Sequence, residues 1–108
     1  MTVRRSGTIG DRGDAVPDPP VHLDEFGLLR SSDTWVSLSP TQEVIMRELI
    51  EHLGEVVGRA QLAAAAWPSG GPDHHAIDVH IHKLRSRVEP LGLVIHTVRG
   101  RGFMLERR

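Results

Sequence analysis

The 108-residue sequence contains no cysteine and no tyrosine, only two tryptophans and two phenylalanines, and a single lysine. The absence of cysteine excludes disulfide bonds, thiolate zinc sites and catalysis by a thiol. No stretch approaches the roughly 20 apolar residues of a membrane-spanning helix, and the N-terminus has no apolar core of the kind found in secretory signals. We therefore expect a soluble, cytoplasmic protein.

Composition and charge change along the chain. Residues 1–20 combine glycines, prolines and charged side chains with few large apolar residues, which favours a disordered leader. Residues 21–108 carry regular apolar patterns and predict one folded domain. Residues 73–108 have a charge balance of +3, whereas residues 1–72 have a balance of −4. A nearly neutral chain with such a basic half can still be steered toward a polyanion.

The first half predicts short strands followed by a helix. Apolar clusters separated by turn residues over 21–38 indicate a small antiparallel sheet. Ser39 precedes Pro40, and Gln42 follows at capping-box spacing, so a helix should begin there and run to about Leu53. The core stripe of this helix is expected at Ile45, Met46, Leu49, Ile50 and Leu53. A second helix is expected over 59–66, where Trp67 and Pro68 would end it.

The segment from about residue 73 to 89 predicts a third helix with Asp73 as its N-cap. At 100° per residue, one face is apolar and belongs to the core; it comprises Ile77, Ile81, Leu84 and Val88. The opposite face is small, polar and basic; it comprises His75, Ala76, Val79, His82, Lys83 and Ser86, with His80 and Arg87 on one shoulder. Such a helix fits the major groove of B-DNA, where lysine can address guanine and Val79 a thymine methyl group. An ordinary solvated helix face is the alternative.

An alternating segment over about 94–105 predicts a β-hairpin with Gly100, Arg101 and Gly102 at its tip. A tip that carries Arg99 and Arg101 can lie along a groove, because a narrow minor groove attracts inserted arginine. A plain exposed turn is the alternative. Strands, three helices and a basic hairpin, in this order, predict an α+β fold of the winged helix-turn-helix type.

Four segments resemble the successive signatures of one family, the C-terminal effector domains of OmpR/PhoB-type response regulators. They are Leu38-Ser-Pro-Thr-Gln, Gly58-Arg-Ala-Gln-Leu, Ile77-Asp-Val-His-Ile-His-Lys-Leu-Arg-Ser-Arg-Val-Glu and Thr97-Val-Arg-Gly-Arg-Gly-Phe. The similarity covers about residues 21–107. It implies a four-stranded N-terminal sheet, a three-helix core, a recognition helix in the major groove and a wing in the adjacent minor groove. The implied function is sequence-specific binding of double-stranded DNA by a bacterial transcriptional regulator.

The resemblance also assigns roles to individual residues. Lys83 stands at a base-contacting position, Val79 at a thymine contact, and Asp78 where an acid can accept from cytosine. Arg99 matches the wing arginine. Phosphate contacts are implied for Thr97, Arg85 and Trp67, although Trp67 could equally be a cap on the core. We further expect the recognition surface to include His75, His80, His82, Arg87 and Arg101.

Departures from the family pattern weaken several of the implied backbone contacts. His75, Ala76 and His82 replace residues that often contact DNA, and Phe103 lacks the hydroxyl of the usual tyrosine. Fewer phosphate contacts should give a shallower dependence of affinity on salt.

We expect a monomer in solution that can bind DNA in tandem. The resemblance implies an RNA polymerase contact through the loop at 68–72, which is short here. No receiver domain precedes the domain in this chain, so we expect an orphan regulator or a piece of a longer protein.

Other classes of protein have less support in the sequence. Catalysis has little support, because the sequence lacks a nucleophile elbow and a phosphate-binding Gly-Lys-Ser/Thr loop. No cofactor is expected. A metal site would need more ligands than the pairs that His74 or His82 can form with Asp78. The remaining alternatives are a regulatory winged-helix module of a larger protein, for example one fused to an enzyme, and a protein-binding winged helix with weakened DNA binding.

Overall fold

The computed structural model describes residues 21–31 and 33–108. It contains three helices: α1 (Pro40–Glu51), α2 (Arg59–Ala66) and α3 (Ala76–Val88). An N-terminal antiparallel sheet has the order β1-β2-β3, with β1 (Val21–Leu23), β2 (Leu28–Ser31) and β3 (Thr34–Ser37). A C-terminal antiparallel sheet has the order β4-β6-β5, with β4 (Val56–Val57), β5 (Leu93–Val98) and β6 (Gly102–Arg107). The predicted winged-helix architecture is confirmed.

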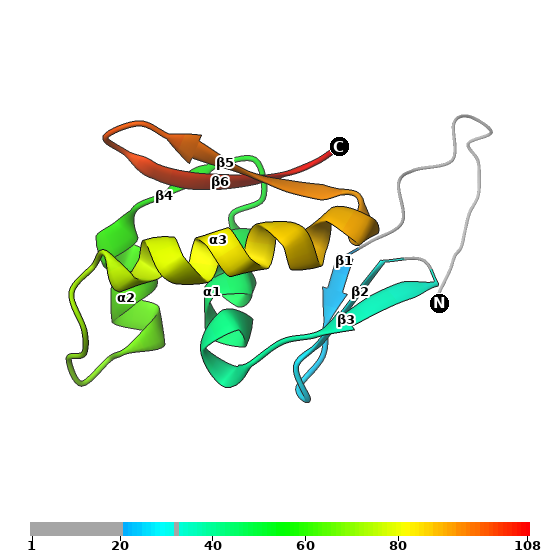
Figure 1. Ribbon diagram of the computed structural model, residues 1–108, viewed down its shortest axis with the longest axis horizontal. Helices are drawn as coiled ribbons and strands as arrows, with labels where there is room; N and C mark the ends of the chain where they lie inside the picture. Colours follow the sequence, from blue (N-terminus) through cyan, green and yellow to red (C-terminus); the bar gives the residue numbers. More distant parts are fainter. Residues whose placement is uncertain (1–20, 32) are drawn as a thin grey trace.

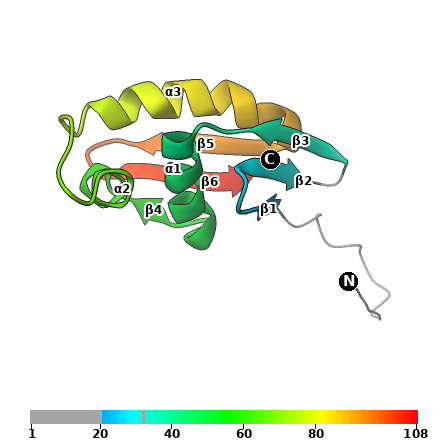
Figure 2. The ribbon, with the colours of Figure 1, turned by 90° about the horizontal axis from the view of Figure 1, so that it is seen from below.

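The elements form one body around a shared hydrophobic core. Figure 1 shows α2 at one end of the molecule and the N-terminal sheet at the other, with α1 and α3 between them. The β5–β6 hairpin runs along the helices, and its tip lies at the α2 end (Figures 1 and 2). All three helices and both sheets contribute buried side chains, among them Leu29, Ile45, Leu62, Leu84 and Leu105.

Helix α1 begins as the capping box predicts. The Ser39 hydroxyl accepts from the Gln42 backbone N–H at 3.2 Å, and the Gln42 side chain accepts from the Ser39 backbone N–H at 3.0 Å. The predicted C-terminus is wrong by two residues, since the helix ends at Glu51. Leu53 was expected in the core stripe, but it follows the end of the helix and is 39% exposed. Gly54, with φ +81°, turns the chain there toward the C-terminal sheet.

Helix α3 begins at Ala76, later than the predicted residue 73, and Asp73 is not its N-cap. The Asp73 carboxylate accepts from the His75 backbone N–H at 2.9 Å, within a turn that precedes the helix. Three successive i to i+3 backbone bonds follow, the first from the Ala76 N–H to the Asp73 carbonyl at 2.9 Å. The chain therefore forms a turn of 3-10 type before the α-helical hydrogen bonds of α3 begin. The helix ends at Val88, where a 3-10 helix (Glu89–Leu91) continues into β5.

Both sheets depart from the sequence prediction in one respect. Strand β4 was not predicted; it pairs with β6 through Val57 opposite Phe103 and makes the hairpin sheet three-stranded. The resemblance implied four strands in the N-terminal sheet, whereas residues 21–31 and 33–108 supply three. The predicted disordered leader, 1–20, lies outside the described residues.

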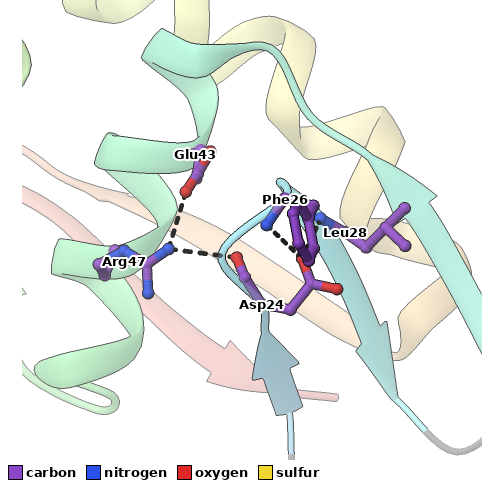
Figure 3. Close-up of polar contacts among 5 residues, drawn as sticks. All are labelled: Asp24, Phe26, Leu28, Glu43 and Arg47. Atoms are coloured by element: carbon purple, nitrogen blue, oxygen red, sulfur yellow. Dashed lines mark hydrogen bonds and ion pairs between the residues drawn. The ribbon is translucent and has the colours of Figure 1, made fainter.

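The turn between β1 and β2 is attached to α1 through polar groups (Figure 3). The Asp24 carboxylate accepts from the backbone N–H groups of Phe26 and Leu28, at 2.8 and 3.0 Å. These bonds, the one from Leu28 above all, hold the pKa of Asp24 below its usual value, and the nearby Arg30 acts in the same direction. Arg47 of α1 donates to the Asp24 carbonyl at 3.3 Å and to Glu43 at 2.8 Å.

Candidate nucleic-acid interface

Helix α3 divides into the two faces that its periodicity predicts. Ile77, Ile81, Leu84 and Val88 are buried. The outward side carries small, polar and basic side chains; the exposed ones are His75, Val79, His82, Lys83 and Ser86. Val79 is 55% exposed, so its methyl groups are accessible to an apolar group outside the domain. This exposed side of α3, together with the hairpin tip at 99–101, is called here the basic surface.

The hairpin tip presents Arg99 and Arg101 to solvent, as predicted. The Arg101 backbone N–H closes the turn on the Val98 carbonyl at 2.9 Å. Gly102, with φ +142°, comes so close to β4 that a Cβ placed there would lie 2.1 Å from the Val57 carbonyl oxygen. Only glycine fits, and the base of the tip is therefore fastened to the body of the domain.

Arg85 joins helix α3 to the first strand of the hairpin. Its Nε donates to the Ile95 carbonyl at 3.0 Å, and its Nη2 donates to the Thr97 hydroxyl. Two predicted phosphate contacts, Arg85 and Thr97, are thus brought together at the surface. Because the guanidinium has further N–H groups and the hydroxyl keeps its own proton, the pair can still donate to an anion.

An open groove follows the solvent side of α3 toward the start of α1. It is lined by Gln42, His82, Lys83, Arg85, Ser86 and Arg87. Arg87 reaches across its far end and donates through Nε to the Ser37 carbonyl at 3.1 Å, which ties α3 to the end of β3. Four of the six lining residues are arginine, lysine or histidine, so the groove offers hydrogen-bond donors to a polyanion.

His80 and Trp67, which were predicted to belong to the recognition surface, are instead half-buried and lie against each other. Their rings are tilted against each other with centroids 6.0 Å apart, and both residues are half-buried. The Nδ1 atom of His80 is buried without a hydrogen-bond partner among the described residues. Trp67 packs on the hydrophobic core, as the core-cap alternative expected. His80 was assigned to the outward shoulder by helical geometry alone, which does not include the neighbouring helix α2.

Asp78 is engaged by Arg59, a residue that the sequence analysis did not select. Arg59 donates to Asp78 Oδ1 from Nε at 3.0 Å, and its Nη2 forms an ion pair with the same oxygen at 2.9 Å. The Arg59 guanidinium also lies over the Phe103 ring, 5.0 Å from its centroid. The two partners are 19 and 44 residues away in sequence, so no local pattern could have predicted the cluster.

Metal and membrane sites find no support in the part of the chain that the structure describes. There, no three His, Asp or Glu side chains come together in a way that could hold an ion. Within the same residues, none of the helices has the length and apolar character needed to cross a bilayer.

The fold and this surface define a winged-helix DNA-binding domain. Residues 33–105 match the family described as "Transcriptional regulatory protein, C terminal", and the chain belongs to that family. It is a transcriptional-regulator DNA-binding domain of the OmpR/PhoB response-regulator type.

Similar proteins agree with this assignment. The protein PetR of Rhodobacter capsulatus is 37% identical over 98 residues, which cover 80% of this chain and 40% of PetR. The solved C-terminal domain of the nisin resistance regulator NsrR is 35% identical, with a TM-score of 0.72, and the match covers 82% of this chain and 94% of that one. The AdeR DNA-binding domain, solved in complex with an intercistronic region, shares the fold with 21% identity and a TM-score of 0.70, over 82% and 95% of the two chains. This chain thus spans about two fifths of the length of PetR.

Proposed function

We propose that this domain binds double-stranded DNA in a sequence-specific manner, with α3 in the major groove and the β5–β6 wing in the adjacent minor groove. The observation that carries the proposal is the bridge from Arg85 to Ile95 and Thr97, which holds the helix beside the wing. The helix and the arginine tip therefore form one continuous basic surface. The AdeR domain, which has the same fold and was solved with an intercistronic region, supports binding to DNA.

The exposed residues divide into base-reading and backbone-binding groups. We assign Lys83 to guanine, Val79 to a thymine methyl group and Arg99 to the minor groove, since these side chains combine exposure with suitable chemistry. The backbone-binding group comprises His75, His82, Arg85, Thr97 and Arg101. His80 and Trp67 belong to neither group, because both are half-buried and their rings lie against each other. Arg87 is exposed and lines the groove, so it stays a predicted DNA contact although it donates to the Ser37 carbonyl.

Selection of bound duplexes from a random library, with the 108-residue chain at moderate salt, tests the proposal. We expect an enriched motif of about six base pairs. Replacing both Lys83 and Arg99 by alanine should weaken binding to that motif by about 2 kcal/mol, roughly 30-fold. A matched control replaces Arg30 and Arg47, which lie on the N-terminal sheet and on α1 and carry the same total charge. Equal losses in the two double variants would argue against a localised DNA interface.

A library with no enriched motif would contradict sequence-specific binding. If the duplexes were then retained only at low salt, the alternative of a protein-binding winged helix would gain support. Four further expectations stay predictions: the RNA polymerase contact through residues 68–72, tandem binding, the monomeric state and a cytoplasmic location.

A further inference from the structure

We infer that Arg59 is an additional phosphate-binding residue of this interface, and that Asp78 is a positioning residue that holds Arg59 rather than a reader of cytosine. The inference rests on the proposed function. It concerns the junction between the start of α2, the first turns of α3 and the start of β6, which is called here the Arg59 cluster and comprises Arg59, Asp78, His75 and Phe103.

Arg59 contacts both of the elements that are proposed to enter the DNA grooves. It is the first residue of α2, and its guanidinium pairs with Asp78 of α3 while lying over Phe103 of β6. The residue before it, Gly58, lies beside the Arg101 carbonyl of the wing, where an added Cβ would come within 3.6 Å. A positive charge is therefore fixed between the recognition helix and the wing, where the phosphate backbone that separates the two grooves would pass.

The guanidinium retains hydrogen-bonding capacity in this position. Arginine has five N–H donors. The pair with Asp78 uses Nε and Nη2, and Nη1 has no partner within residues 21–31 and 33–108. The side chain is 34% exposed, so solvent or an anion can reach it. A guanidinium that is already held by a carboxylate and an aromatic ring loses little conformational freedom when it binds a phosphate.

Asp78, in contrast, is already engaged in an ion pair. Its Oδ1 accepts from Nε of Arg59 at 3.0 Å and lies 2.9 Å from Nη2, whereas its Oδ2 lies 3.6 Å from Nδ1 of His75. The pair with Arg59 thus leaves only Oδ2 to accept from a cytosine, in the orientation that Arg59 sets. The pairing has a second effect, since it offsets a negative charge that would otherwise face the phosphates.

The test compares slopes of log affinity against log salt on the selected duplex for four proteins: wild type, Arg59→Gln, Arg59→Lys and Arg47→Gln. In Arg59→Gln, the loss of one phosphate contact should make the negative slope less steep by about one unit. Arg59→Lys keeps the charge and should keep the slope. Arg47→Gln removes a guanidinium that is likewise paired with one carboxylate, but on the side of α1 that faces the β1–β2 turn (Figure 3), and should also keep it.

The second readout is the selected motif of Asp78→Asn, whose amide oxygen can still accept from Arg59. We expect the wild-type motif, with tighter binding because a negative charge has been removed. A changed preference at one base pair would overturn the positioning role, and a wild-type slope in Arg59→Gln would overturn the phosphate contact. A purely structural Arg59 would lower the melting temperature without changing the slope. If the wild type bound no duplex, the proposed function would fail first and this inference with it.

Discussion

The two sheets have the same number of strands and the same antiparallel pairing, yet they are integrated into the domain very differently. The C-terminal sheet contributes five side chains to the core, Val57, Leu93, Ile95, Phe103 and Leu105. Strands β1–β3 send only Leu29 to full burial. The N-terminal sheet is otherwise attached by the partly buried Val21, Leu23 and Val36 and by polar links, such as Arg47 to the Asp24 carbonyl and Arg87 to the Ser37 carbonyl. We therefore expect the N-terminal sheet to open locally more readily than the wing.

The largest effect on stability is expected from Gly102→Ala, because this change disrupts the close contact between the wing and β4. The new Cβ would meet the Val57 carbonyl oxygen at a backbone angle that alanine disfavours. We expect a loss of about 3–5 kcal/mol in the free energy of unfolding, measured by denaturant titration. The control is Gly100→Ala, which also has positive φ, +74°, but meets nothing within 4 Å and should cost only about 1 kcal/mol. Equal costs would contradict the proposed fastening at Gly102.

Leu29→Ala removes the main apolar anchor of the N-terminal sheet. Truncation of a fully buried leucine costs about 2–5 kcal/mol. Because few other buried groups hold these strands, we expect hydrogen exchange to accelerate in β1–β3 while β5 and β6 keep their protection. Leu105→Ala, the same change in the C-terminal sheet, should instead reduce protection throughout the domain. Similar exchange patterns in both variants would remove the distinction between the sheets.

The polar attachment of the N-terminal sheet should depend on pH through Asp24. Its pKa is lowered in the folded protein, so the carboxylate stabilises the fold above the usual value of 3.8, and this contribution is lost as the pH falls through the lower folded pKa. Asp24→Asn should therefore melt at a lower temperature than wild type at pH 7. The two melting temperatures should converge below pH 3.8. A constant difference across this range would show that the charge of Asp24 is not responsible.

The smallest effect is expected from Trp35→Ser on the outer face of β3. Trp35 is 62% exposed, so its replacement should change the free energy of unfolding by less than about 0.5 kcal/mol in a thermal melt. Trp67→Ser provides the contrast, because that ring packs on the core and should cost several times more. A large effect at Trp35 would show that the outer face of this sheet is covered in solution.

Local sequence patterns predicted the features that depend on neighbouring residues, such as helix faces and helix starts. The spacing of Ile77, Ile81 and Leu84 was enough to identify the buried side of α3, and the Ser39 capping box located the start of α1. Contacts between distant segments could not be predicted in this way. The Arg87 bond to Ser37 spans 50 residues, and β4 has only two residues and so no periodicity. Of the residues in the Arg59 cluster, the sequence could nominate Asp78 and His75 but not the arginine that organises them.

The Arg85 bridge has a consequence for how DNA would be sampled. Because one guanidinium holds α3 and β5 at a fixed separation, the distance between the inserted helix and the arginine tip is set before any encounter. Such a domain should bind most tightly to duplexes whose groove widths already match this distance. Duplexes that must be deformed to fit should bind more weakly, because the deformation costs free energy. Base pairs that no side chain touches, between the two insertion points, should then influence affinity through the shape and stiffness that they give to the double helix.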